Sequence, residues 1–133
     1  MFKGLFSKKP VPLIGAPPVR RMKTYSGQSG YVYQYYFDGY RAYREAHEQG
    51  REFVFTVSAD RKMWHAVSVH LHDDAVAQWE SAHARTLSGN ERYAVAKLAL
   101  FQAFDDRATP ALMKEPVRVR AADVESIIET LGL

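Results

Sequence analysis

The spacing of apolar residues changes once along this chain, near His72, from a repeat of two to a repeat of nearly four. Before that point, the segments 51–58 and 63–71 alternate apolar and polar residues, as strands with one buried face do. After it, apolar residues recur every three or four positions, as they do on one side of a helix. Strands followed by helices predict an α+β fold in which the helices pack on one face of an antiparallel sheet.

Four strands are predicted before this change, at 19–26, 31–44, 51–58 and 63–71. Short polar or glycine-containing turns, such as the one expected at 45–50, separate them. The strands must therefore form an antiparallel meander, because a parallel pair needs a crossover of about a dozen residues. Gly39 lies inside the second strand and predicts a β-bulge or a strong bend there.

Three helices and one short strand are predicted after the change: helices at 72–87, 91–107 and 121–131, and an edge strand at 117–120. Ser88 and Glu91 have the spacing of a capping box, which begins the second helix. The apolar stripe of that helix is wider than a surface helix needs. This helix is therefore expected either between the sheet and another helix or at a subunit interface.

The chain length of 133 residues fits one domain. Four of the prolines lie in the segment 10–18, which also follows several lysines. We therefore expect a flexible, basic, proline-rich arm at 1–18, followed by a single domain at 19–133. The absence of cysteine excludes disulfides and thiolate chemistry, and no apolar run reaches the roughly 20 residues that span a bilayer.

The formal net charge of +3 is unevenly distributed. Residues 1–30 contain bases and no acid, whereas residues 31–133 contain more acids than bases. Proteins that bind nucleic acid normally carry a basic surface on the folded domain, because contacts to phosphate supply most of the affinity. The charge distribution therefore makes nucleic acid a less favoured partner.

A stretch rich in tyrosine and arginine is the most unusual feature of the sequence. Tyrosine and arginine are enriched where proteins bind their partners. Three interpretations stay open: tyrosines that line the sheet beneath the helices, a protein–protein or homodimer surface, and a platform on which nucleotides or other ligands stack. The candidate binding residues are Tyr31, Tyr33, Tyr35, Tyr36, Tyr40, Arg41, Tyr43 and Arg44.

His70 and His72 form a weak candidate metal site. Residues two apart on a strand point to the same face, so both imidazoles could reach one ion. Together with Asp73 they would suit zinc, iron or manganese. The alternative is that both histidines face water and that an aspartate caps the following helix.

The sequence contains no Gly-x-Ser-x-Gly or Ser-x-x-Lys motif and no phosphate-binding loop. It therefore predicts a non-catalytic interaction or binding module of bacterial type, with no cofactor. We expect a cytoplasmic homodimer that uses the tyrosine–arginine strand, because a partly apolar outer sheet face would need a cover, and a further protein partner stays open. The alternatives are a nucleic-acid-binding protein that adds the basic arm, and a metal-dependent enzyme that uses His70 and His72.

Overall fold

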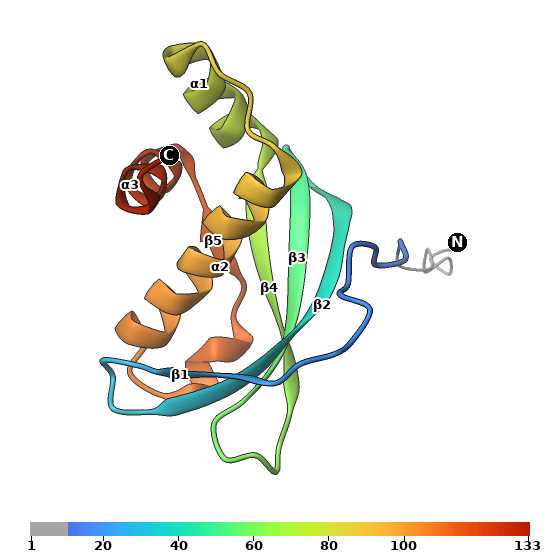
Figure 1. The fold of residues 1–133 in the computed structure, drawn as a ribbon, viewed down its shortest axis with the longest axis vertical. Coiled ribbons are helices and arrows are strands. Elements are labelled where there is room, and N and C mark those ends of the chain that lie inside the picture. The colour runs from blue at the N-terminus through green and yellow to red at the C-terminus, as the bar shows by residue number, and fades with distance from the viewer. Residues whose placement is uncertain (1–10) are drawn as a thin grey trace.

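A computed structural model describes residues 11–133. Its single sheet has the strand order β1-β2-β3-β4-β5, and the α-helices lie against it (Figure 1). The elements follow one another as β1 (Lys23–Ser26), β2 (Val32–Glu45), β3 (Glu48–Ser58), β4 (His65–His72), α1 (Asp73–His83), α2 (Gly89–Asp106), the 3-10 helix η1 (Pro110–Lys114), β5 (Val117–Val119) and α3 (Ala121–Leu131). Strands β1 to β4 are antiparallel, and β5 runs parallel to β4 at the edge. This arrangement confirms the predicted α+β fold. None of the helices described is both long and apolar enough to cross a membrane.

Several boundaries differ from those expected from the sequence. The first predicted helix, expected at 72–87, ends at His83, because Ala84 takes the left-handed conformation that ends a helix. The turn predicted at 45–50 is limited to Ala46 and His47, because Ala46 takes the positive φ of 40° that a tight reversal needs. The first strand begins at Lys23 and not at residue 19, because the pairing with β2 ends at Lys23 and Tyr35 and residues 19–22 belong to no strand.

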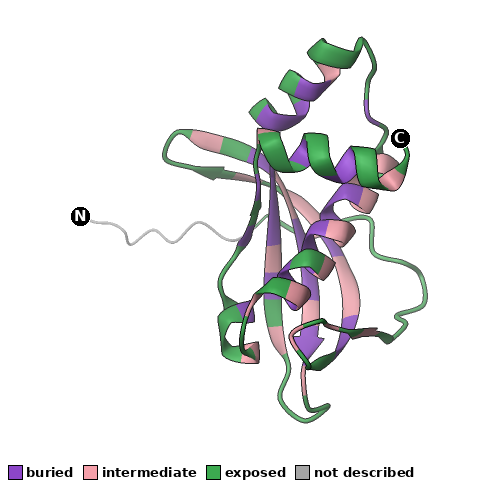
Figure 2. Cartoon of the chain, turned by 90° about the vertical axis from the view of Figure 1, so that its left-hand side faces the viewer, coloured by how far each residue is buried: buried purple, intermediate pink, exposed green. Residues whose placement is uncertain are grey.

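One face of the sheet and the inner sides of the helices form the core. Figure 2 shows buried positions alternating along the strands and running along one side of each helix. The strand residues Phe53, Phe55 and Val57 of β3 are completely buried. They belong to a core cluster that also contains Val67, Val69, Leu71, Val76, Trp79, Val95, Leu100, Phe104, Val119, Val124 and Ile127.

Strand β2 contains the β-bulge predicted at Gly39. The pairing with β3 shifts register between Phe37 and Gly39, and Gly39 has a φ of 117°. Asp38 is thus the extra residue. Phe37 pairs with Phe55 and Tyr40 pairs with Phe53, so both face the helices although their numbers differ in parity.

The segment before β1 lies along the free edge of β2. Ile14 forms an isolated antiparallel bridge with Tyr40. From there residues 15–22, which we call the strap, lead to β1. Only residues 11–18 of the arm expected at 1–18 belong to the described part of the chain, and residues 1–10 lie outside it.

Candidate functional site

A groove lies between the strap, the helix-facing side of β2 and the start of α2. Its volume is about 760 Å³, within the range of roughly 300–1,000 Å³ that is usual for small-molecule sites. Gly15, Pro17 and Pro18 of the strap form one wall, and Gly89 and Asn90 of α2 form part of another. The groove therefore depends on a segment that is distant in sequence from the two elements it faces.

Aromatic rings form the floor of the groove. The Phe37 ring lies 4.6 Å from Tyr93 of α2 and 5.2 Å from Phe55, centroid to centroid. The Tyr40 ring lies 5.6 Å from that of Phe53. Phe53 is completely buried, but Phe37, Tyr40 and Tyr93 are only half-buried. The groove thus leaves aromatic surface in contact with solvent, which a ligand could cover.

The charges around the groove have one sign. Among the described residues that line it, Arg21 and Lys23 are basic and none is acidic. Lys97 lies next to the wall, with its Nζ 6.0 Å from the centroid of the Tyr93 ring. Burial lowers the pKa of Lys97, and the positive charge of Lys23 lowers it further. The groove therefore lies in a positive electrostatic environment.

The first turn of α2 adds hydrogen-bond donors to the groove. Ser88 accepts a hydrogen bond from the N–H of Glu91, and the Glu91 carboxylate accepts one from the N–H of Ser88, which confirms the predicted capping box. The N–H groups of Gly89 and Asn90, at the first two positions of the helix, have no intrahelical partner. The start of a helix favours negative charge at this place.

The candidate tyrosines do not form one surface. Tyr33 and Tyr35 are 0% and 4% exposed, and the Tyr33 ring stacks on Phe104 of α2 at 4.2 Å. These two residues therefore line the sheet beneath a helix. Tyr31 is 39% exposed, and Tyr40 lies in the groove.

The remaining candidates lie on the face of the sheet that the helices do not cover, or at its end. Tyr36 packs against Trp64, 5.5 Å between centroids, and Arg20 of the strap lies 4.0 Å above the Tyr36 ring. Arg41 donates a hydrogen bond of 2.9 Å to Glu52. Arg44 is exposed near the end of β2.

His70 and His72 point to this same helix-free face, as the strand period predicts, and both are buried. The Tyr43 ring stacks on His70 at 4.4 Å, and the Tyr43 hydroxyl lies 2.7 Å from Nδ1 of His72. Gly50 of β3 pairs with both Tyr43 and His72. Because Gly50 has no side chain, the tyrosine can reach across β3 to the histidine.

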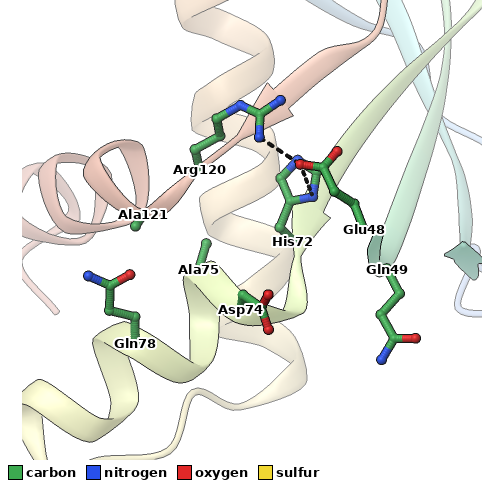
Figure 3. A pocket seen from close by; sticks show the side chains of 8 residues that line it. All are labelled: Glu48, Gln49, His72, Asp74, Ala75, Gln78, Arg120 and Ala121. Atoms are coloured by element: carbon green, nitrogen blue, oxygen red, sulfur yellow. Dashed lines mark hydrogen bonds and ion pairs between the residues drawn. The ribbon is translucent and has the colours of Figure 1, made fainter. Parts of the chain in front are cut away.

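Burial, and secondarily Glu48, raise the pKa of Tyr43 to about 12, while burial lowers the pKa of His72. The hydroxyl therefore stays protonated and the imidazole stays neutral, and the two groups share a hydrogen bond. Figure 3 shows the Glu48 carboxylate joined to both Arg120 and His72, beside a pocket of about 150 Å³. The other imidazole nitrogen of His72, Nε2, has no hydrogen-bond partner among the described residues.

Glu52 is the most strongly perturbed acid of this face. Its pKa is lowered to about 2, first by His70 and then by hydrogen bonds from Arg41 and Ser68. The His70 Nε2 lies 3.8 Å from the carboxylate, an ion-pair distance that is longer than a hydrogen bond. Glu52 is thus already paired with His70, Arg41 and Ser68.

The metal site proposed for His70, His72 and Asp73 has no third ligand in place. Asp73 is exposed at the first position of α1. Within residues 11–133, no three histidine, aspartate or glutamate side chains are arranged to hold a metal ion.

No protein-family model, curated protein or solved structure matches this chain.

Sequence reasoning missed most of the groove. It identified Tyr35 and Tyr40 as binding residues but not Phe37, Phe53 or Tyr93. Two features of the sequence could have indicated the groove. They are the adjacent Pro17 and Pro18 and the bulge predicted at Gly39. Neither signal shows that the strap lies beside β2, because that depends on the distant pairing of Ile14 with Tyr40.

Proposed function

We propose that this chain is a non-catalytic binding module that takes an apolar small molecule into the groove beneath the strap. The observation that carries the proposal is the half-buried aromatic floor of a hollow of about 760 Å³. Binding sites for small molecules are typically concave, mainly apolar and equipped with a few polar groups. The groove has each of these properties.

The expected affinity follows from the apolar area that a ligand would cover. Burial of about 250 Å² of ligand and groove surface together contributes about 6 kcal/mol before the cost of association. Ring-on-ring contacts with Phe37, Tyr40 and Tyr93 each add about 1 kcal/mol. Association costs at least about 4 kcal/mol, which leaves about 5 kcal/mol and a dissociation constant of about 0.2 mM for a bicyclic aromatic probe.

The chemistry of the lining supports binding without catalysis. The described residues that line the groove include no histidine, serine or acid. The titratable residues Glu52, His70 and His72 lie on the opposite face of the sheet, where Glu52 pairs with His70 and the Nδ1 atom of His72 contacts Tyr43. A general acid or base needs to reach the bound molecule.

Fluorescence of N-phenyl-1-naphthylamine, a neutral aromatic probe, tests the proposal. Asn90→Trp places an indole in the wall of the groove and should weaken binding at least tenfold. Gln102→Trp is the matched control, because Gln102 is exposed on the same helix but outside the groove. The proposal is wrong if the wild-type chain shows no saturable binding of the probe, or if both variants bind like it.

We also retain the proposal that the chain forms a homodimer, with a further protein partner possible. The Tyr36–Trp64 pair on the helix-free face supports it. Val32, four residues before Tyr36 on β2, and Met63, next to Trp64, are 45% and 74% exposed, and exposed apolar side chains favour a protein contact. The bacterial type and the cytoplasmic location stay predictions of the sequence.

A further inference from the structure

We propose that the ligand of the groove is an amphipathic anion. Its apolar body would lie on the aromatic floor, and its carboxylate, sulfonate or phosphate head would lie beside Arg21, Lys23 and the start of α2. This inference rests on the proposed function, because the groove must bind a molecule before the charge of that molecule matters.

The charged residues that line the groove are all basic. Arg21 and Lys23 both line the groove, and neither makes an ion pair with an acid in residues 11–133. Lys97 is close enough to Lys23 for the two charges to repel each other. Like charges near one another raise the free energy of the empty site, and an anion between them lowers it.

The second argument comes from the start of α2. This helix has 18 residues, so its dipole is fully developed. Gly89 and Asn90 line the groove, and their N–H groups belong to the first turn, whose N–H groups a helix leaves unpaired. The nearby Glu91 carboxylate is already bound by the N–H of Ser88 and by Arg85, so it offers these N–H groups no competing partner.

The apolar and the charged residues of the groove lie in separate parts of it. Phe37 and Phe53 are wholly hydrocarbon and lie on the floor, whereas Arg21 and Lys23 are exposed to solvent. A molecule that matches both parts must itself have an apolar end and an anionic end. An aromatic acid and an acyl-chain acid share this chemistry.

A matched pair of probes tests the inference. 1-Anilinonaphthalene-8-sulfonate has the same rings as N-phenyl-1-naphthylamine and adds one sulfonate. We expect the double variant Arg21→Gln/Lys23→Gln to weaken binding of the sulfonate about tenfold, because two partly exposed charges each contribute about threefold. Binding of the neutral probe should change by less than about twofold. Lys62→Gln/Lys114→Gln is the control, because both lysines are exposed outside the groove.

The outcomes separate this inference from the proposed function. Equal binding of the two probes, unchanged in the Arg21→Gln/Lys23→Gln variant, would overturn the anion and leave the groove as an apolar site. Failure of both probes to bind would overturn both proposals. Sulfonate binding that weakens as protein concentration rises would show that a second copy of the chain covers the groove, and would also overturn the inference.

Competition identifies the source of the apolar body. Dodecanoate that displaces the sulfonate, where dodecanol does not, supports an acyl anion. Displacement by 2-naphthoate alone supports an aromatic anion. Displacement by dodecanol as strongly as by dodecanoate would contradict the requirement for charge.

Discussion

Ile14 and Tyr40 exchange two backbone hydrogen bonds, with N–O distances of 2.9 and 2.8 Å. The pairing of β1 with β2 ends at Tyr35, so Ile14 occupies an edge of β2 that β1 has left. This single bridge holds the beginning of the strap in place. It thereby fixes one wall of the groove to the strand that supplies the floor.

Replacing Gly39 by alanine should release this wall. Gly39 has a φ of 117°, and an added Cβ would lie 2.6 Å from the carbonyl oxygen of Ile14. We expect Gly39→Ala to lower the free energy of unfolding by about 2 kcal/mol, because strain and overlap both oppose the native backbone. Urea denaturation measures this loss, and binding of N-phenyl-1-naphthylamine should weaken with it.

Gly89→Ala serves as the control for this glycine, because a Cβ at Gly89 has no neighbour within 4 Å. Its stability should equal or slightly exceed that of the wild type. Unchanged stability and probe binding in Gly39→Ala would show that the strap does not depend on the bulge.

Glu52 should make the fold sensitive to acid. Its pKa is about 2 in the folded chain against an ordinary value of 4.5. A lowered pKa stabilises the fold above pH 4.5, and this stabilisation is lost as the pH falls from 4.5 towards 2. The contribution is on the order of 3 kcal/mol.

Glu52→Gln should therefore reduce stability at pH 7 by about 2 kcal/mol and flatten its decline between pH 4.5 and pH 2. Guanidinium unfolding curves across this range measure both effects. A variant whose stability falls with pH as steeply as that of the wild type would place the acid sensitivity elsewhere.

Tyr43 should stabilise the buried histidines through its hydroxyl. Tyr43→Phe leaves Nδ1 of His72 without its partner at 2.7 Å, which should cost about 1–2 kcal/mol of unfolding free energy. The raised pKa means that this stabilisation is present below pH 10.0 and is lost as the pH rises towards 12. The variant should lack that alkaline loss in denaturation experiments.

Tyr31→Phe is the matched control, because Tyr31 is 39% exposed. The unfolding free energy of this variant should differ from that of the wild type by less than about 0.5 kcal/mol. Equal effects of the two substitutions would mean that the hydroxyl–imidazole contact contributes nothing.

The partly exposed Tyr36–Trp64 pair should mediate self-association. Sedimentation should show a dimer at high protein concentration, and Tyr36→Ser/Trp64→Ser should shift it to monomer. Leu112→Ser is the control, because Leu112 is 46% exposed on η1. A wild-type chain that stays monomeric at the highest concentration would contradict the homodimer.

Local patterns predicted most of the fold. The alternation in 51–58 and 63–71 identified β3 and β4, and Ser88 with Glu91 identified the start of α2. These features depend on neighbours within a few residues, where sequence spacing determines which side chains meet. The bulge at Gly39 was predictable for the same reason, because a glycine weakens the interior of a long strand unless the strand bends or bulges there.

The candidate site depended on contacts that sequence spacing does not specify. A bulge reverses the parity of every later residue in its strand, so the faces of Tyr40 and Tyr43 could not be assigned beforehand. The period placed His70 and His72 on one face, but their partner Tyr43 comes from a strand two positions away. Its approach requires the register that brings Gly50 between them.

The single additional residue in β2 determines which chemistry each side of the sheet receives. If Asp38 paired in regular register with no bulge, Tyr40 would stand opposite Glu52, and Arg41 would stand opposite Arg51 on the side that packs against helices. A guanidinium would then be forced towards the apolar interior, and the groove would lose a ring. Because of the bulge at Asp38, one continuous strand places aromatic side chains in the core and in the groove, and charged side chains on the helix-free face.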